Sequence, residues 1–220
     1  MISVIINKQK YNVPTSWDDV TYSQWLNTLN ETDTLKLASF ITDIPLNYLE
    51  ALSDFQLNKI GYLLNFLKTE IDGNCQIDVV DIRLDEWGKK IELQQLVEKN
   101  KDNLLPFLKN IVKIYIQNDN DSIVYVYKMA FNLLDQLKKI LEIESEQLHV
   151  RPTSEQINAG LDMFDEFGVM NTIKAVALGN ILNFDNVLKI KYNVVFLFLK
   201  MSKTETIYQE NYRKLLNANR

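Results

Sequence analysis

The sequence predicts a mainly α-helical protein, a multi-helix bundle with a small β-hairpin at its N-terminal end. Hydrophobic residues make up 46% of the 220 residues, which is enough to form a core. Only 6 Gly and 4 Pro are present, and both residues interrupt helices. Apolar side chains also recur at spacings of three and four over most of the chain, as on one face of a helix.

The hairpin is predicted at the start of the chain. The runs Ile2–Ile6 and Tyr11–Val13 are rich in β-branched or aromatic residues, and the polar residues 7–10 separate them. Two such runs around a short polar turn are typical of a hairpin. Pro14 ends it, because proline cannot donate a hydrogen bond to the ladder.

Three capping signals predict the first helices. Thr21 caps a helix that runs to about Leu29, Asp33 and Thr34 open a second, and Ser53 begins a capping box of the form Ser-x-x-Gln. After the turn at residues 72–74, the β-branched residues of the segment 76–82 predict a strand that would pair with the hairpin.

The middle of the chain predicts three further helices. One follows Trp87, and its surroundings resemble those of Trp25 only loosely, so we predict no repeat. Asp102 is the expected cap of the next helix, which has Pro106 in its first turns. The helix after Ser122 carries a wide apolar stripe and is expected to be buried between neighbours.

Residues 151–154, Arg-Pro-Thr-Ser, form the clearest internal boundary. They divide an N-terminal region, 1–150, from a C-terminal helical region, 151–220, unless the two form one continuous domain. Thr153 or Ser154 should cap a helix that ends at Gly168, and a short helix should follow and end at Gly179.

A long final helix is predicted after residues 183–185. Its expected buried row is Val187, Ile190, Val194, Leu197 and Met201, widened by a second row of Leu188, Tyr192, Val195 and Leu199. After Lys203 the helix becomes polar, so we expect this half to project or to meet a partner. Truncation after Met201 should therefore leave the fold largely intact and impair assembly.

Charge and cysteine content exclude several classes of protein. The net charge is −5 and the pI is about 5.0, which argues against broad binding of nucleic acid, and Lys138-Lys139 is best read as a solvated pair. The single Cys75 can form neither an internal disulfide nor a structural metal site, and a reducing compartment follows. No targeting signal is visible, and the apolar run 194–199 is too short to span a membrane.

No catalytic, cofactor-binding or metal-binding residues are predicted. His149 is the only histidine and has no evident catalytic partner. The carboxylates of Asp162, Asp165 and Glu166 could share a metal ion, but they are better explained as the solvated face opposite Leu161, Phe164 and Phe167. The segment 118–122 lacks the central glycine and closing glutamate of a calcium loop. The protein is therefore not expected to be an enzyme.

Three stretches together support a resemblance. They are the hairpin followed by Val13-Pro14-Thr15-Ser16-Trp17-Asp18-Asp19-Val20-Thr21, the stretch Leu84-Asp85-Glu86-Trp87-Gly88-Lys89-Lys90-Ile91-Glu92-Leu93, and Phe164-Asp165-Glu166-Phe167-Gly168 with Leu178-Gly179-Asn180-Ile181-Leu182-Asn183-Phe184-Asp185 and the closing helix. This arrangement resembles small helical proteins from the structural modules of tailed bacteriophages, particularly crAss-like phages and other phages of Bacteroidota hosts. It covers most of the chain and carries over no functional residues.

The resemblance implies a virion assembly protein without a cofactor. The leading hypothesis is a structural subunit of a neck or tail ring, which binds further copies of itself and neighbouring phage structural proteins in the virion. The hairpin and the polar end of the last helix are the expected contact elements. The alternative is a tail-assembly chaperone in the host cytoplasm, which would expose a hydrophobic groove when free. An enzyme or a DNA-binding regulator is a third hypothesis, disfavoured because no such motif is found.

Overall fold

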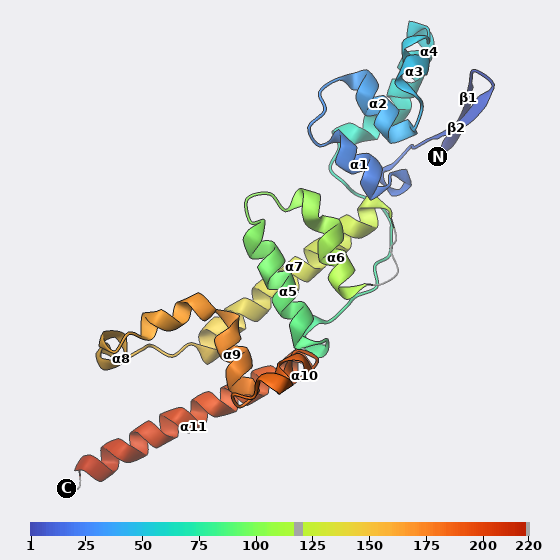
Figure 1. Ribbon diagram of the computed structural model, residues 1–220. Coiled ribbons are helices and arrows are strands. Elements are labelled where there is room, and N and C mark those ends of the chain that lie inside the picture. Colours follow the sequence, from blue (N-terminus) through green and yellow to red (C-terminus); the bar gives the residue numbers. More distant parts are fainter. Residues whose placement is uncertain (117–120, 219–220) are drawn as a thin grey trace. The chain divides into compact units, whose positions relative to one another are not determined.

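The computed structural model describes residues 1–116 and 121–218, and it is mainly helical with one two-stranded antiparallel hairpin (Figure 1). Its internal contacts divide the chain into two compact units. Unit 1 comprises residues 1–79 and 102–132, and unit 2 comprises residues 80–101 and 133–220. The predicted fold class is confirmed.

Unit 1 contains the hairpin and a set of short helices. In chain order its elements are β1 (Ile2–Ile6), β2 (Gln9–Val13), the 3₁₀ turn η1 (Trp17–Asp19), α1 (Tyr22–Thr28), α2 (Thr34–Thr42), α3 (Leu46–Glu50), α4 (Asp54–Leu63), η2 (Leu64–Lys68), η4 (Leu105–Phe107), α6 (Leu108–Tyr115) and the first ten residues of α7 (Ile123–Leu148). Its core combines the buried aromatic residues Trp17, Tyr22, Trp25, Tyr115 and Tyr125 with aliphatic side chains, of which Val13, Val20, Ile41, Ile44, Leu49, Leu108, Ile111 and Ile123 are fully buried.

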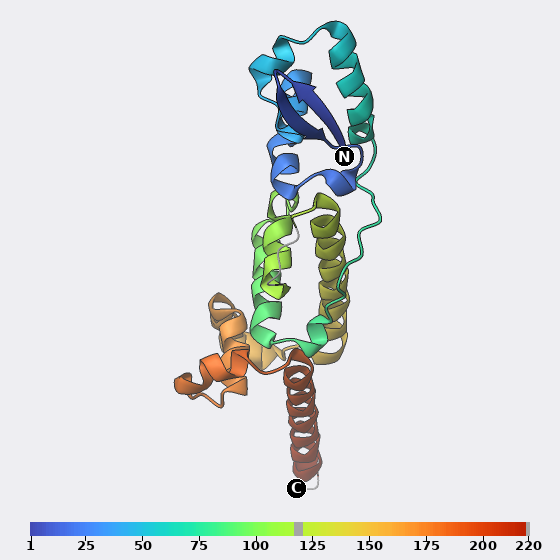
Figure 2. The same ribbon diagram turned by 90° about the vertical axis from the view of Figure 1, so that its right-hand side faces the viewer.

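Unit 2 contains the rest of α7 and the C-terminal helices (Figure 2). Its other elements are η3 (Ile82–Leu84), α5 (Trp87–Lys99), α8 (Ser154–Asn158), η5 (Leu161–Phe167), α9 (Val169–Val176), η6 (Ile181–Asn183), α10 (Phe184–Leu188) and α11 (Tyr192–Ala218). The core side chains of this unit come from η3, α5, α7, α9, α10 and the first turns of α11, and include Ile82, Trp87, Leu93, Leu133, Leu137, Ile140, Ile173, Val187, Tyr192 and Val195.

The predicted helix starts are confirmed where a capping box specifies them. The Thr21 hydroxyl accepts from the backbone N–H of Gln24 at 3.1 Å, and the Gln24 side chain accepts from the N–H of Thr21 at 2.9 Å. Ser53 with Gln56 opens α4, and Thr153 with Gln156 opens α8. Each box satisfies backbone N–H groups that the helix itself leaves unpaired.

One local arrangement occurs in both units and was not predicted. In unit 1, Tyr22 N–H donates to Asp121 O and Ile123 N–H donates to Val20 O, which joins the starts of α1 and α7. In unit 2, Trp87 N–H donates to Ile190 O and Tyr192 N–H donates to Asp85 O, which joins the starts of α5 and α11 in the same way. In each unit a 3₁₀ turn precedes the first of the two helices. In this arrangement Trp87 takes the position of Tyr22 and not that of Trp25, so the loose sequence likeness does not align the equivalent residues.

Two predictions are wrong: the length of the hairpin turn and the strand over residues 76–82. The polar turn spans only Asn7 and Lys8, which both have positive φ, so β2 begins at Gln9. The strand expected over 76–82 does not form. Within unit 2, the Gln136 side chain donates to Val80 O at 2.7 Å and accepts from Ile82 N–H at 3.1 Å, so a side chain takes the hydrogen bonds that a neighbouring strand would make.

Asp102 does not cap a helix. The 3₁₀ turn starts at Leu105 with Leu104 as its cap, and α6 follows from Leu108. Pro106 sets this start, because proline favours the first positions of a helix, where its missing N–H would be unpaired anyway.

The C-terminal region also differs from its prediction. Gly160, with φ of +85°, ends α8 early, so the expected single helix becomes α8 and the 3₁₀ turn η5, while Gly168 ends η5 as predicted. The long final helix begins at Tyr192, because Ile190 and Lys191 leave helical geometry to pair with the start of α5. As a result Tyr192 and Val195 face the core, whereas Val194, Leu197 and Met201 of the expected buried row are exposed.

Candidate interaction surfaces

The residues considered for chemistry do not come together. His149 is exposed, and its backbone O accepts from Lys203 Nζ at 2.9 Å. Cys75 is half-buried in unit 1, and its Sγ contacts Gln76 O at 3.4 Å. Lys139 pairs with Asp135 at 2.6 Å on the exposed side of α7.

The carboxylates of Asp162, Asp165 and Glu166 lie on the exposed turn η5. In residues 1–116 and 121–218, no group of three or more His, Cys, Asp or Glu side chains is placed to hold a metal ion. The apolar residues of this turn, Leu161, Phe164 and Phe167, are also exposed, so the expected division into a solvated and a buried face is wrong. Residues 118–120 of the Asp- and Asn-rich segment lie outside the described residues.

The most distinctive surface of unit 2 is a row of exposed apolar residues along α11. The first turns of this helix bury Tyr192 and Val195 against the unit, and the opposite side exposes a second apolar row that continues to the end of the helix. Both Figure 1 and Figure 2 show no other element of unit 2 beside the C-terminal half of α11. We call this row the C-terminal seam: Val194, Leu197, Phe198, Met201, Tyr208, Tyr212 and Leu215.

The seam is accessible without any opening of unit 2. Leu197 is 57% exposed, Met201 64% and Leu215 65%. A shallow groove runs along it, lined by Leu197, Lys200, Met201, Thr204, Glu205 and Tyr208. Exposed apolar rows of this kind are typical of surfaces that contact another protein.

A second apolar surface covers the segment 154–182 of unit 2, which we call the apolar arm. Only Ile173 and Ala177 of the arm are buried. Its exposed apolar residues are Ile157, Leu161, Met163, Phe164, Phe167, Met170, Leu178, Ile181 and Leu182, of which Leu178 and Leu182 are more than 80% exposed. The arm therefore presents far more apolar surface than its own fold requires.

In unit 1 an apolar groove lies between β1 and α4. It is lined by Ile2, Val4, Phe55, Asn58, Lys59, Tyr62 and Leu63, and we call it the hairpin groove. Ile2 and Val4 alternate along β1 and so lie on one face of the hairpin. Phe55 is 67% exposed and Tyr62 82%, so the groove opens to solvent.

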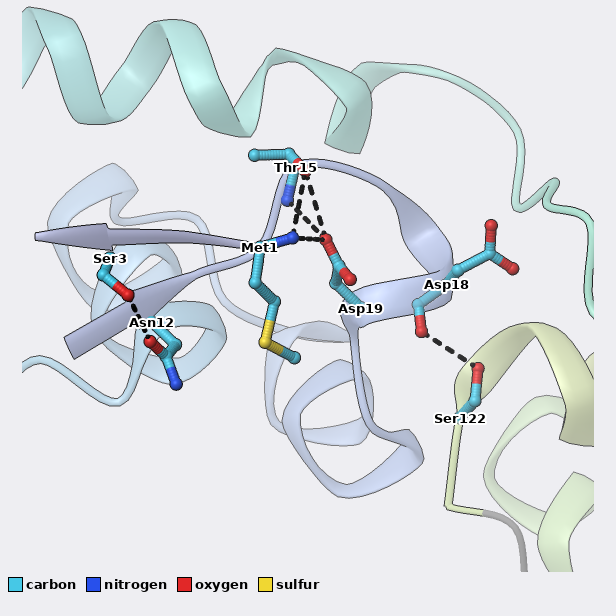
Figure 3. A network of polar contacts seen from close by, with 7 residues as sticks. All are labelled: Met1, Ser3, Asn12, Thr15, Asp18, Asp19 and Ser122. Carbon is cyan, nitrogen blue, oxygen red and sulfur yellow. Dashed lines mark hydrogen bonds and ion pairs between the residues drawn. The ribbon is translucent and has the colours of Figure 1, made fainter.

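Polar contacts join the hairpin, which forms one side of this groove, to the turn η1. Figure 3 shows the Met1 ammonium, which lies 2.7 Å from an Asp19 carboxylate oxygen, and that oxygen also accepts from Thr15. Ser3 and Asn12 pair across the strands at 2.9 Å, and the Ser122 hydroxyl lies 3.5 Å from Asp18 O. Burial raises the pKa of Asp19, but the hydrogen bonds from the ammonium and Thr15 outweigh it and the net pKa is lowered.

A buried ion pair lies beneath the start of the seam in unit 2. Lys90 of α5 is 3% exposed, and its Nζ lies 2.8 Å from Glu144 of α7 and 3.0 Å from Gln94. Nζ also lies 5.6 Å from the centre of the Tyr192 ring. Burial raises the pKa of the Tyr192 hydroxyl, and the nearby Glu144 carboxylate raises it further. The pair joins α5, α7 and α11 and so fixes which face of α11 is turned outward.

The sequence indicated only part of these surfaces. The hairpin and the end of the last helix were the expected contact elements, and both carry exposed apolar residues. Of the seam, Val194, Leu197 and Met201 are expected in the core from the sequence, because two apolar rows on one helix look alike there, and the residues after Lys203 are expected to be polar. Its signal is the regular spacing of Val194, Met201, Tyr208 and Leu215, which continues past Lys203.

The sequence matches no known protein-family model, and no curated protein or solved structure shows significant similarity to the chain. Among the described helices, none combines the length and the hydrophobicity that a membrane crossing requires.

Proposed function

We propose that this protein is a non-enzymatic assembly protein of a tailed-bacteriophage virion, a structural subunit of a neck or tail ring. Its function is to bind further copies of itself and neighbouring phage structural proteins. The virion is its final location, and assembly takes place in the host cytoplasm.

The observation that carries the proposal is the uncovered apolar surface of unit 2. The seam and the arm place more than a dozen large apolar side chains in solvent on a unit whose core is already formed. A protein that acts alone gains nothing from such surface, whereas a subunit buries it against its neighbours. The sequence resemblance to phage structural-module proteins supplies the phage context of the proposal.

The test is quantitative mass spectrometry of purified particles of the phage that encodes the chain. We expect the chain at a fixed copy number relative to the major capsid protein in every preparation. Particles that lack it would contradict a structural role.

A second candidate function is a tail-assembly chaperone, favoured by the open hairpin groove of unit 1. A chaperone of this kind binds an aggregation-prone tail protein and then leaves. It would be abundant in infected cells and absent from purified particles, so the same measurement separates the two functions.

A further inference from the structure

We propose that the C-terminal seam pairs two copies of this chain as a parallel two-stranded coiled coil. The proposal deepens the self-association in the proposed function, on which it rests, because it names the partner, the contact and its orientation.

The first argument is the period of the seam. Val194, Met201, Tyr208 and Leu215 are spaced by seven residues, and Leu197, Thr204 and Asn211 follow the first three of them at a distance of three residues. These are the a and d positions of a heptad repeat, which lets two helices remain in contact along their length. The two residue rows keep this spacing over three heptads of α11.

The second argument is that unit 2 leaves these positions free. The side chains that α11 buries are Tyr192 and Val195, and Lys203 donates to the backbone O of Gln147 and of His149 at the end of α7. None of these three residues occupies an a or d position. The a and d residues are all exposed, so a second helix could bind without displacing any part of unit 2.

The third argument is the shape of the groove on the seam. Its six lining residues form two consecutive sets with the spacing i, i+3, i+4, i+7. The sets are 197, 200, 201 and 204, then 201, 204, 205 and 208. Four residues at this spacing enclose the hole that receives one a or d side chain of a partner helix. The groove therefore lies where a partner's a or d side chains would insert in this register.

The flanking charges select a parallel partner of the same sequence. In a parallel pair, the residue before an a position faces the residue five places later on the other helix. Lys200 then faces Glu205 of the second copy and Ile207 faces Tyr212 of the second copy, so these two contacts are complementary, whereas Asn193 faces Phe198 of the second copy. Within its own chain Lys200 also donates to the side chain of Gln147 at 2.9 Å. The a and d residues also meet their own counterparts, so the apolar layers of Met201 and Leu215 stay separate from the polar layers of Thr204 and Asn211.

An antiparallel pair is less favourable with the same residues. The register that gives the longest overlap places Lys200 near Lys214 of the second copy and Glu205 near Glu205 of the second copy. It also places Met201 opposite Asn211 and Tyr208 opposite Thr204. Like charges and mixed apolar and polar layers both weaken this arrangement.

The first test measures the mass of the full-length chain in solution by light scattering. We expect wild type at twice the chain mass of 25.7 kDa. The double variant Met201→Glu, Tyr208→Glu should run as a monomer with unchanged circular dichroism. The control Thr206→Glu, Gln209→Glu adds the same charge on the opposite face of α11 and should remain dimeric.

The second test determines the orientation in a Cys75→Ser background. Leu215→Cys should form a disulfide-linked dimer on oxidation, because residue 215 meets its own counterpart only in a parallel pair. Absence of this cross-link from a dimeric sample would overturn the proposal. So would a monomeric wild type at up to ~100 μM, or a dimer that the seam variant leaves intact.

These outcomes are separable from the function itself. If the seam variants stay dimeric while the chain is found at fixed copy number in particles, the coiled coil fails and the structural role stands. If the seam pairs as expected but particles lack the chain, the structural role fails and the coiled coil stands.

Discussion

At the scale of single residues, two charged contacts hold elements together, and they differ in burial. The Asp19 side chain is partly exposed, at 22%, whereas Lys90 is buried in unit 2, at 3%. We therefore expect the Asp19 contact to make stability depend on pH, and the Lys90 contact to make stability sensitive to which partner is substituted.

Asp19 should make stability depend on pH. Because its folded-state pKa is lowered, its contribution is present above the usual aspartate range and is lost as pH falls through the folded value. The difference in unfolding free energy between wild type and Asp19→Asn, measured by urea denaturation of chains with a free Met1, should be constant near neutrality and shrink below about pH 4. Asp162→Asn, at an exposed carboxylate that makes none of these contacts, should show no such trend.

Lys90 and Glu144 should respond unequally to substitution. Glu144→Ala leaves the buried ammonium of Lys90 without its carboxylate, and we expect a loss of roughly 3 kcal/mol in unfolding free energy. Lys90→Met keeps the packing of the side-chain stem and leaves the partly exposed Glu144 to solvent, so we expect about 1 kcal/mol or less. Equal losses in chemical denaturation would show that the pair is not buried as described.

At the scale of elements, helix starts could be predicted from the sequence and the ends of elements could not. Thr21, Ser53 and Thr153 each act within three residues of their own position, so a local pattern specifies them. The strand expected at 76–82 failed because Gln136, more than 50 residues away, supplies its hydrogen bonds. The outward row of α11 was misassigned for a similar reason, since pairing of residues 190 and 191 with the start of α5 sets where this helix begins.

The hairpin turn gives a prediction at this scale. Lys8 has φ of +64°, a conformation that costs a residue with a side chain about 1 kcal/mol and costs glycine little. We expect Lys8→Gly to raise the unfolding free energy by ~0.5 kcal/mol, because Asn-Gly is a preferred pair for this type of turn. Lys10→Gly lies within β2 and should lower it, and thermal unfolding of both variants makes the comparison.

The two halves of α11 should differ in their importance for stability. Lys203 donates to two carbonyl groups at the end of α7, and no residue from Glu205 to Asn217 is buried. Truncation after Thr204 should therefore preserve the melting temperature and abolish self-association. Truncation after Leu199, which also removes Lys203, should lower the melting temperature. A lowered melting temperature for both would place the end of the helix in the core.

At the scale of the whole molecule, the chain is two compact units that use one local arrangement twice. In each unit a 3₁₀ turn and a short helix are joined to the start of a long helix by two backbone hydrogen bonds. The side chains around this arrangement differ between the units, so the sequence shows only a faint likeness. The fold class could be predicted from composition and periodicity. The interaction surfaces could not, because they depend on which of several apolar rows on a helix is buried in the core.

Exposed apolar surface should be measurable on the intact protein. Leu178, Ile181 and Leu182 are 73% exposed or more, and serine at all three positions should reduce the fluorescence of bound anilinonaphthalene sulfonate in the native state. The melting temperature should stay unchanged, because these side chains contribute little to the core. A marked fall in melting temperature would instead place these residues in the core.

The three capping boxes share a further detail, which is that each uses glutamine and not glutamate at its third position: Gln24, Gln56 and Gln156. A glutamate in this role takes up a proton in acid and then accepts hydrogen bonds less strongly. The glutamine amide has no such equilibrium. The capping pairs at the starts of α1, α4 and α8 are therefore neutral, although Asp54 and Glu155 add carboxylates to the first turns of α4 and α8. The glutamine caps themselves should persist across a range of acidity that weakens carboxylate caps.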